Sequence, residues 1–116
     1  MNMKDQSVKK KWLRALRSGK FKQAQGDLYD GRAYCCLGVL AKIKGAELKL
    51  GKYGEYEAYV GGKAVSADGE NFLRPRFAGL SRATQERLAE LNDGNEFNGV
   101  KRHSFKKIAD YIEENL

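Results

Sequence analysis

The sequence YCCLGVLA occupies residues 34–41 and is the longest unbroken apolar run in the chain. A run this short fits either a buried strand or a buried helix, because periodicity does not separate the two when every face is hydrophobic. The residues that follow favour a helix, since Lys42 and Lys44 suit the negative pole of a helix dipole and Gly45 supplies a left-handed stop. We therefore predict a buried central helix, in which Gly38 marks the close approach of a neighbouring segment.

Three further helices are predicted from their caps and from the spacing of their apolar residues. Each begins after a serine or aspartate that can accept a hydrogen bond from the first turn. The last of them has the cleanest amphipathic pattern in the chain. In order, the expected helices run from Asp5 or Ser7 to about Ser18, over about residues 82–91 after Ser81, and over residues 105–116 after Ser104.

Short strands are predicted between the central helix and the last two helices. Residues 47–50 and, less cleanly, residues 56–60 alternate apolar and polar side chains as half-buried strands do. Gly61-Gly62 is a two-residue hairpin signal with residues 63–65 as its return arm, and residues 71–73 are a candidate third strand. Because the strands are gathered in the middle, we predict an α+β fold of about four helices with a short antiparallel β-hairpin or three-stranded sheet.

The length of 116 residues predicts a single domain, residues 1–116. No stretch approaches the roughly 18 apolar residues of a membrane-spanning helix. The N-terminus carries charge without the apolar core of a signal peptide. We therefore expect a cytoplasmic protein with no membrane partner.

The net charge of +7 is concentrated in the first half of the chain. Residues 1–50 carry twelve Lys and Arg against four Asp and Glu, whereas residues 51–116 carry ten against eleven. A positive field on one part of a protein attracts polyanions, acidic proteins or nucleotides.

Seven of these cations lie within fourteen residues, in and after the first predicted helix. This basic ridge comprises Lys9, Lys10, Lys11, Arg14, Arg17, Lys20 and Lys22. If six of them reached DNA phosphates, log affinity would fall with log salt with a slope of about −5. Phe21 and Tyr29 are candidates to stack on a base. The alternative is a solvated helix face, and no helix-turn-helix, zinc-finger or RNP pattern accompanies the ridge.

A second group of cations could add to an anion site. Whether this group lies beside the basic ridge does not follow from the sequence. It comprises Arg74 and Arg76 next to Phe77, together with Lys101, Arg102, Lys106 and Lys107.

Cys35 is the sharpest candidate for a catalytic group. A thiol at a helix N-terminus has a lowered pKa and is a better nucleophile, with His103 as the base and Gln23 or Gln25 as an oxyanion donor. The opposing interpretation is an inert buried thiol and an exposed histidine, which the apolar run favours. Two adjacent cysteines and one histidine do not supply four zinc ligands, so neither a metal nor another cofactor is indicated.

Several stretches of the chain resemble a family of small uncharacterised proteins found in bacteriophages and bacterial genomes. The resemblance spans most of the chain, and the double-cysteine run is its most specific part. It is carried by WLRALRSG at 12–19, YCCLGVL at 34–40, GLS at 79–81, LND at 91–93 and SFKKIADYIE at 104–113. The family brings no established activity, so the resemblance implies only a setting: an accessory protein, phage-encoded or bacterial, working inside a bacterial cell.

Three functions follow from these observations. The first is a small non-enzymatic binding protein for an anionic ligand, either nucleic acid or a phosphorylated nucleotide or other small molecule. The second is a phage effector that binds and inhibits or sequesters an acidic host protein. The third is a cysteine-dependent enzyme.

Overall fold

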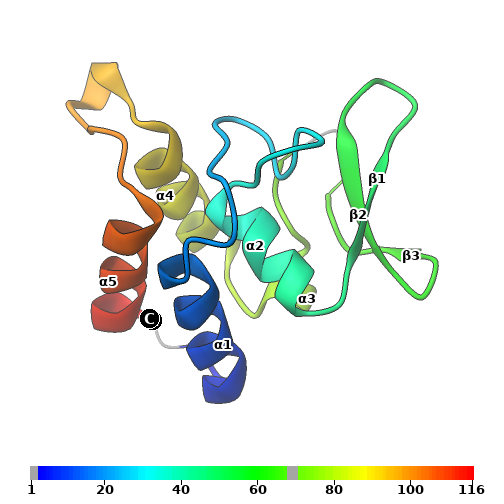
Figure 1. Ribbon diagram of the computed structural model, residues 1–116, viewed down its shortest axis with the longest axis horizontal. Coiled ribbons are helices and arrows are strands. Elements are labelled where there is room, and N and C mark those ends of the chain that lie inside the picture. The colour runs from blue at the N-terminus through cyan, green and yellow to red at the C-terminus, as the bar shows by residue number, and fades with distance from the viewer. Residues whose placement is uncertain (1–2, 68–70) are drawn as a thin grey trace.

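The computed structural model describes residues 3–67 and 71–116. Within these residues, four longer helices surround one hydrophobic core, and a three-stranded antiparallel sheet lies at one end of the molecule (Figure 1). Helix α1 packs against α2 and α5, and α4 packs against α2 and α5. The helices are α1 (Gln6–Arg17), α2 (Cys36–Ile43), α4 (Arg82–Asp93) and α5 (Phe105–Asn115), and the strands are β1 (Glu47–Leu50), β2 (Tyr56–Val60) and β3 (Lys63–Ala64). The predicted α+β fold class is confirmed.

Helix α2 is the buried centre of the structure. All of its residues from Cys36 to Ala41 are buried. The indole Nε1 of Trp12 on α1 donates a hydrogen bond of 2.9 Å to the carbonyl of Cys36. Because Cys35 is the N-cap of this helix, Tyr34 lies before it, and the helix begins two residues after the start of the apolar run.

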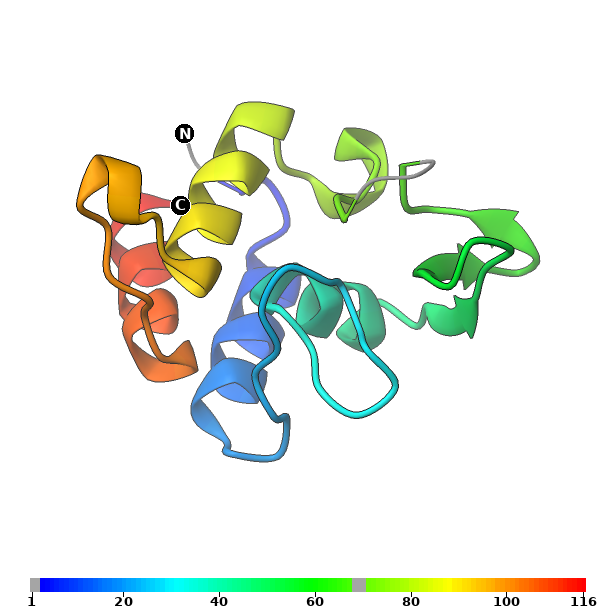
Figure 2. The same ribbon diagram turned by 90° about the horizontal axis from the view of Figure 1, so that it is seen from above.

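The 20–34 loop passes directly over α2, which explains Gly38. Figure 2 shows this loop, light blue to cyan, beside the helix. A Cβ atom on Gly38 would lie 1.9 Å from the carbonyl oxygen of Leu28. The same carbonyl accepts a hydrogen bond of 3.2 Å from the backbone N–H of Cys35. The predicted close approach is confirmed, and it is made by backbone.

The sheet follows the predicted hairpin, with one correction. Strand β1 pairs with β2 in the register Leu48 to Ala58, and β2 pairs with β3 across Gly61-Gly62, whose φ angles of 57° and 82° suit a two-residue hairpin turn. Residues 71–73 do not form the candidate third strand. Only Leu73 makes an isolated bridge, to Ser66, and β3 is the third strand instead.

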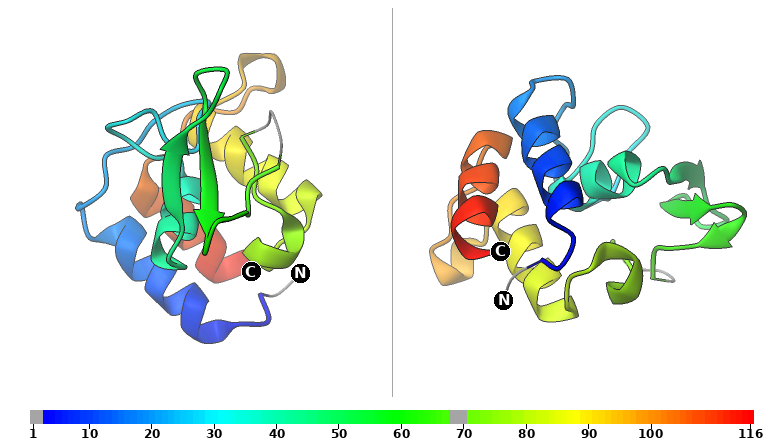
Figure 3. Two further views of the ribbon diagram at one scale, coloured as in Figure 1. Left: turned by 90° about the vertical axis from the view of Figure 1, so that its right-hand side faces the viewer. Right: turned by 90° about the horizontal axis from the view of Figure 1, so that it is seen from below.

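Two short helical segments were not predicted. Helix α3 (Pro75–Ala78) is a single turn with proline in its first position, and η1 (Glu96–Asn98) is a 3₁₀ turn. Met3 and Leu116 lie side by side, because the backbone N–H of Met3 donates to the carbonyl of Leu116 at 2.7 Å; Figure 3 shows the segment that leads into α1, in blue, near the end of α5, in red. Among the described residues, every helix is too short or too polar to cross a membrane.

Replacing Gly38 with alanine is expected to lower the free energy of unfolding by about 1–3 kcal/mol. The cause is the clash of the new Cβ with the carbonyl oxygen of Leu28. Helix propensity alone would raise stability by up to about 1 kcal/mol, so the sign of the change distinguishes the two effects. Urea unfolding followed by circular dichroism measures it, and a variant as stable as the natural chain would contradict the close approach.

Candidate anion-binding surface

Helix α1 divides the basic ridge into cations that face solvent and cations that are half-buried. Lys10, Lys11 and Arg14 are exposed, whereas Lys9 and Arg17 are half-buried. The buried residues of the same helix form one face that packs on the core. The spacing of the ridge along the helix therefore leaves three of its five helical cations fully available to a ligand.

The turn after α1 brings Lys20 and Phe21 back against the end of the helix. Ser18 caps this end: its hydroxyl donates to the carbonyl of Ala15 at 2.7 Å and accepts from the backbone N–H of Lys20 at 3.1 Å. Gly19 reverses the chain with a φ of 76°, a conformation that glycine adopts without strain. The turn creates a hollow of about 240 Å³, the basic hollow. It is lined by Lys11, Arg14, Ala15, Ser18, Lys20 and Phe21.

The cations around the basic hollow, Lys11, Arg14 and Lys20, form no ion pairs with carboxylates of the residues that the structure describes. Three positive charges held around one small hollow repel one another and attract an anion. The C-terminal end of α1 carries a partial negative charge, which these three full charges outweigh.

The two predicted stacking residues lie in different surroundings. Phe21 lines the basic hollow and packs edge-on against Tyr34, with ring centroids 5.2 Å apart. Tyr29 packs between Tyr34 and Tyr56, at centroid distances of 4.5 and 4.8 Å, and its hydroxyl donates to the carbonyl of Gly31. The structure therefore brings Phe21 to the cations, whereas the ring of Tyr29 packs among other aromatic side chains.

Arg17 is engaged by carboxylates of α5. Its guanidinium lies 2.8 Å from Asp110 and 3.1 Å from Glu113. Hydrogen bonds to Glu113 and Asp110 raise the pKa of Arg17 above its ordinary value. This residue of the basic ridge therefore joins α1 to α5, and its charge is largely neutralised within the protein.

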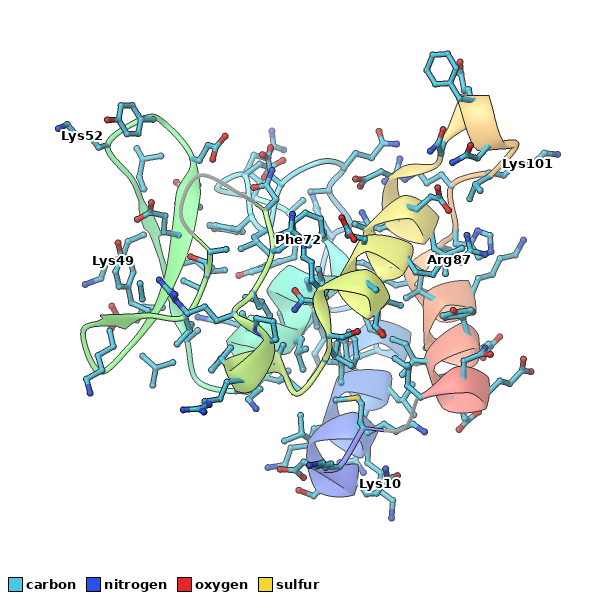
Figure 4. All side chains as sticks on the ribbon, turned by 180° about the vertical axis from the view of Figure 1, so that it is seen from behind. Lys10, Lys49, Lys52, Phe72, Arg87 and Lys101 are labelled. Carbon is cyan, nitrogen blue, oxygen red and sulfur yellow. The ribbon has the colours of Figure 1, made fainter. Side chains whose placement is uncertain are left out.

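The second group of cations is spread over separate parts of the molecule. Arg74 and Arg76 lie at α3, and the other four come from residues 101–107, before and within the first turn of α5. Figure 4 shows Lys10 and Lys101 at opposite ends of the molecule. Arg102 nevertheless reaches the 20–34 loop, where its guanidinium donates to the carbonyl of Gln23 at 3.4 Å, so this part of the second group lies next to Lys22 of the basic ridge.

The structure corrects the interpretation of Cys35 as an activated thiol. Cys35 is the N-cap of α2, and its Sγ accepts a long hydrogen bond of 3.4 Å from the N–H of Gly38. Burial nevertheless raises the pKa of Cys35 to about 12, because desolvation penalises the thiolate more than the helix amides stabilise it. Burial also raises the pKa of Cys36 well above its ordinary value. The expected lowered pKa at the helix N-terminus is wrong in direction.

The other members of the proposed catalytic set are engaged in hydrogen bonds. The side-chain amide of Gln23 donates to Oδ1 of Asn92 at 3.1 Å and to the carbonyl of His103 at 2.8 Å. The amide of Gln25 donates to a backbone carbonyl at the end of α4. In the part of the chain that the structure describes, no three His, Cys, Asp or Glu side chains form a group that could hold a metal ion.

Asn92 holds the 20–34 loop in place, a role that the sequence did not reveal. Its side chain is fully buried. Its Oδ1 also accepts from the N–H of Cys36 at 3.2 Å, and its Nδ2 donates to the carbonyl of Ala24 at 2.7 Å. An asparagine shortly before a glycine is a common helix stop. The sequence therefore contained no sign that Asn92 is buried and helps to position the basic hollow.

The native protein is expected to resist alkylation by iodoacetamide at neutral pH. Cys35 and Cys36 are buried, and their raised pKa values leave almost no thiolate. In urea both thiols should react, which serves as the control. Mass spectrometry counts the modified cysteines, and rapid labelling of Cys35 in the folded protein would contradict its burial.

The raised pKa of Cys35 also predicts a loss of stability in alkaline solution. The pKa is 9.0 for an ordinary cysteine and about 12 in the folded protein, so the folded state binds more protons between these values. The contribution to stability is complete below pH 9 and is lost as the pH rises towards 12. The urea midpoint should therefore fall less steeply above pH 9 in the Cys35→Ser variant, which keeps a capping side chain without titrating. Equal slopes would contradict the assignment.

Comparison with known proteins gives a family and no activity. A family model described as "Domain of unknown function (DUF8296)" matches residues 3–84, which include the basic ridge, α2 and the sheet. Neither the search of curated proteins nor the search of solved structures returned a match. Because the family model covers more than half of the chain, the protein belongs to this family of domains of unknown function, DUF8296.

Proposed function

We propose that this protein is a non-enzymatic binding protein for a phosphate-bearing ligand, and that the basic hollow receives the phosphate. One observation carries this proposal: Lys11, Arg14 and Lys20 surround the hollow without carboxylate partners in the described part of the chain, and Phe21 forms part of its wall. Unpaired cations beside an aromatic ring match a phosphate attached to a base.

Single-stranded nucleic acid is the ligand that these features favour over a free nucleotide. The hollow of about 240 Å³ is smaller than the roughly 300–1,000 Å³ of sites that enclose a whole small molecule. Lys10 on α1 and Lys22 on the loop are exposed and offer further phosphate contacts. A chain of phosphates can use these cations in addition to the hollow, whereas one nucleotide cannot.

The proposed setting is the cytoplasm of a bacterial cell, with the protein acting as a phage or bacterial accessory factor. The motifs at residues 12–19 and 34–40 support this setting through their resemblance to proteins of phage and bacterial genomes. Membership of a family of unknown function is compatible with it.

A second candidate is an effector that binds and inhibits or sequesters an acidic host protein. The observation in its favour is the exposure of two aromatic side chains, Tyr53 at 88% and Phe97 at 102%. Aromatic residues are enriched where proteins bind one another. Capture from bacterial lysate distinguishes the candidates, because a protein partner is retained after nuclease treatment and a nucleic acid is not.

The triple variant Lys11→Ala, Arg14→Ala, Lys20→Ala is expected to bind a fluorescent oligothymidylate at least about tenfold more weakly than the natural protein. If five cations contact phosphates, the log–log salt slope of the natural protein should be about −3.5, and the variant's slope should be shallower. Fluorescence anisotropy at several salt concentrations measures both quantities.

The matched control is Lys49→Ala, Lys52→Ala, Lys63→Ala, which removes the same charge from the sheet region. This control should retain binding within about threefold, since the sheet lies apart from α1. Equal losses in the two variants would show attraction by net charge alone and would refute the site. No binding by the natural protein at micromolar concentration and low salt would refute the nucleic-acid function.

A further inference from the structure

A second and larger cavity lies at the other end of α1, away from the basic hollow. Its volume is about 600 Å³, within the usual range of small-molecule sites. It is formed where the start of α1, the end of α2 and the single turn of α3 meet. Its apolar lining comes from Met3, Val8, Pro75, Ala78 and Leu80.

The apolar floor of this cavity is held in place by backbone contacts. Met3 is buried; its N–H donates to the carbonyl of Leu116 at 2.7 Å and its own carbonyl accepts from Nε2 of Gln6 at 2.6 Å. Gly79, with a φ of 70°, ends α3 and turns the chain so that Leu80 is buried beside the cavity. Met3, Ala78 and Leu80 therefore belong to the hydrophobic core, so this part of the lining does not need to rearrange to receive a ligand.

The rim of the cavity is positively charged. Lys4, Lys44 and Arg76 line it, and within the described residues none of them forms an ion pair. Asp5 is the one carboxylate among the lining residues, and its pKa is lowered mainly by hydrogen bonds from the N–H of Val8 and the hydroxyl of Ser7. Three cations and one carboxylate leave the rim with a net charge of +2 at neutral pH.

Lys44 is the best positioned of these cations. Lys44 is half-buried, and its Nζ lies 5.0 Å from the ring centroid of Phe77 on α3. A lysine over an aromatic ring is restrained there by the attraction between the charge and the ring. The side chain of Lys44, which lines the cavity, is therefore restrained beside α3, and its charge also helps to lower the pKa of Asp5.

We infer that this cavity binds a small amphipathic organic anion, with its hydrocarbon part on the apolar floor and its acidic head between Lys44 and Arg76. The floor excludes a polyphosphate, because it offers apolar atoms where such a ligand needs hydrogen-bond donors. The positive rim selects a carboxylate over an alcohol of the same length. This site is distinct from the basic hollow, and the inference does not rest on the proposed nucleic-acid function.

The test uses octanoate and octan-1-ol, which share a hydrocarbon chain and differ in charge. Titration of the ¹⁵N-labelled full chain with octanoate should produce saturable shifts of the amide signals of Val8, Ala78 and Leu80. The apparent dissociation constant for octanol should be at least tenfold higher. Equal affinity for the two molecules, the absence of saturable shifts up to millimolar octanoate, or shifts confined to other residues would overturn the inference.

Two double variants test which cations are responsible for the preference for octanoate over octan-1-ol. Lys44→Gln with Arg76→Gln should abolish the preference for octanoate, whereas Lys42→Gln with Arg74→Gln should retain it. The control residues lie on or next to the same helices and do not line the cavity. Loss of the preference in both variants would overturn the assignment. Octanoate should leave oligothymidylate affinity unchanged, so failure here does not refute the basic hollow.

Discussion

The buried side-chain amide of Asn92 fixes how the segments of this protein meet. It contacts the N–H of Cys36 at the start of α2, the carbonyl of Ala24 and the amide of Gln23 in the 20–34 loop. Leaving a buried amide without its hydrogen bonds costs about 1–3 kcal/mol. The start of α2 and the 20–34 loop are therefore held in the arrangement that satisfies the amide of Asn92. The buried side-chain amide of Gln85 fixes another segment in the same way, because it accepts from the N–H of Leu73 and donates to the carbonyl of Leu73.

The fold could be predicted from the sequence where its signals are local, and it could not where buried amides connect residues that are distant in the chain. Helices α1, α4 and α5 have a serine or aspartate cap and a periodic apolar face, both of which are local signals. The start of α2 has no such local signal, because its N-cap is Cys35, an unusual capping residue. Residues 71–73 have the composition of a strand, but the backbone of Leu73 is satisfied by Gln85, twelve positions away. A strand pattern does not reveal such a partner.

The residues of the candidate sites likewise divide into those that are close together in the sequence and those that only the fold brings together. The sequence identified Lys11, Arg14, Lys20 and Phe21 because they are close together in the chain, and a single turn at Gly19 gathers them. The partners of Arg17 come from α5, more than ninety residues later, so its ion pairs could not be foreseen. The larger cavity was also missed, because Lys4, Lys44 and Arg76 are assembled from three distant segments. The burial of Cys35 outweighed the helix dipole, and local pattern contains no measure of burial.

The position of the only tryptophan has a practical consequence. Trp12 is fully buried, and its indole is bonded to the carbonyl of Cys36. Successive helical residues are about 100° apart, so Trp12 and Arg14 point to nearly opposite sides of α1. Its fluorescence is thus an intrinsic optical reporter of core hydration: denaturation alters the emission without any attached dye, while occupancy of the solvent-facing side leaves the signal undisturbed.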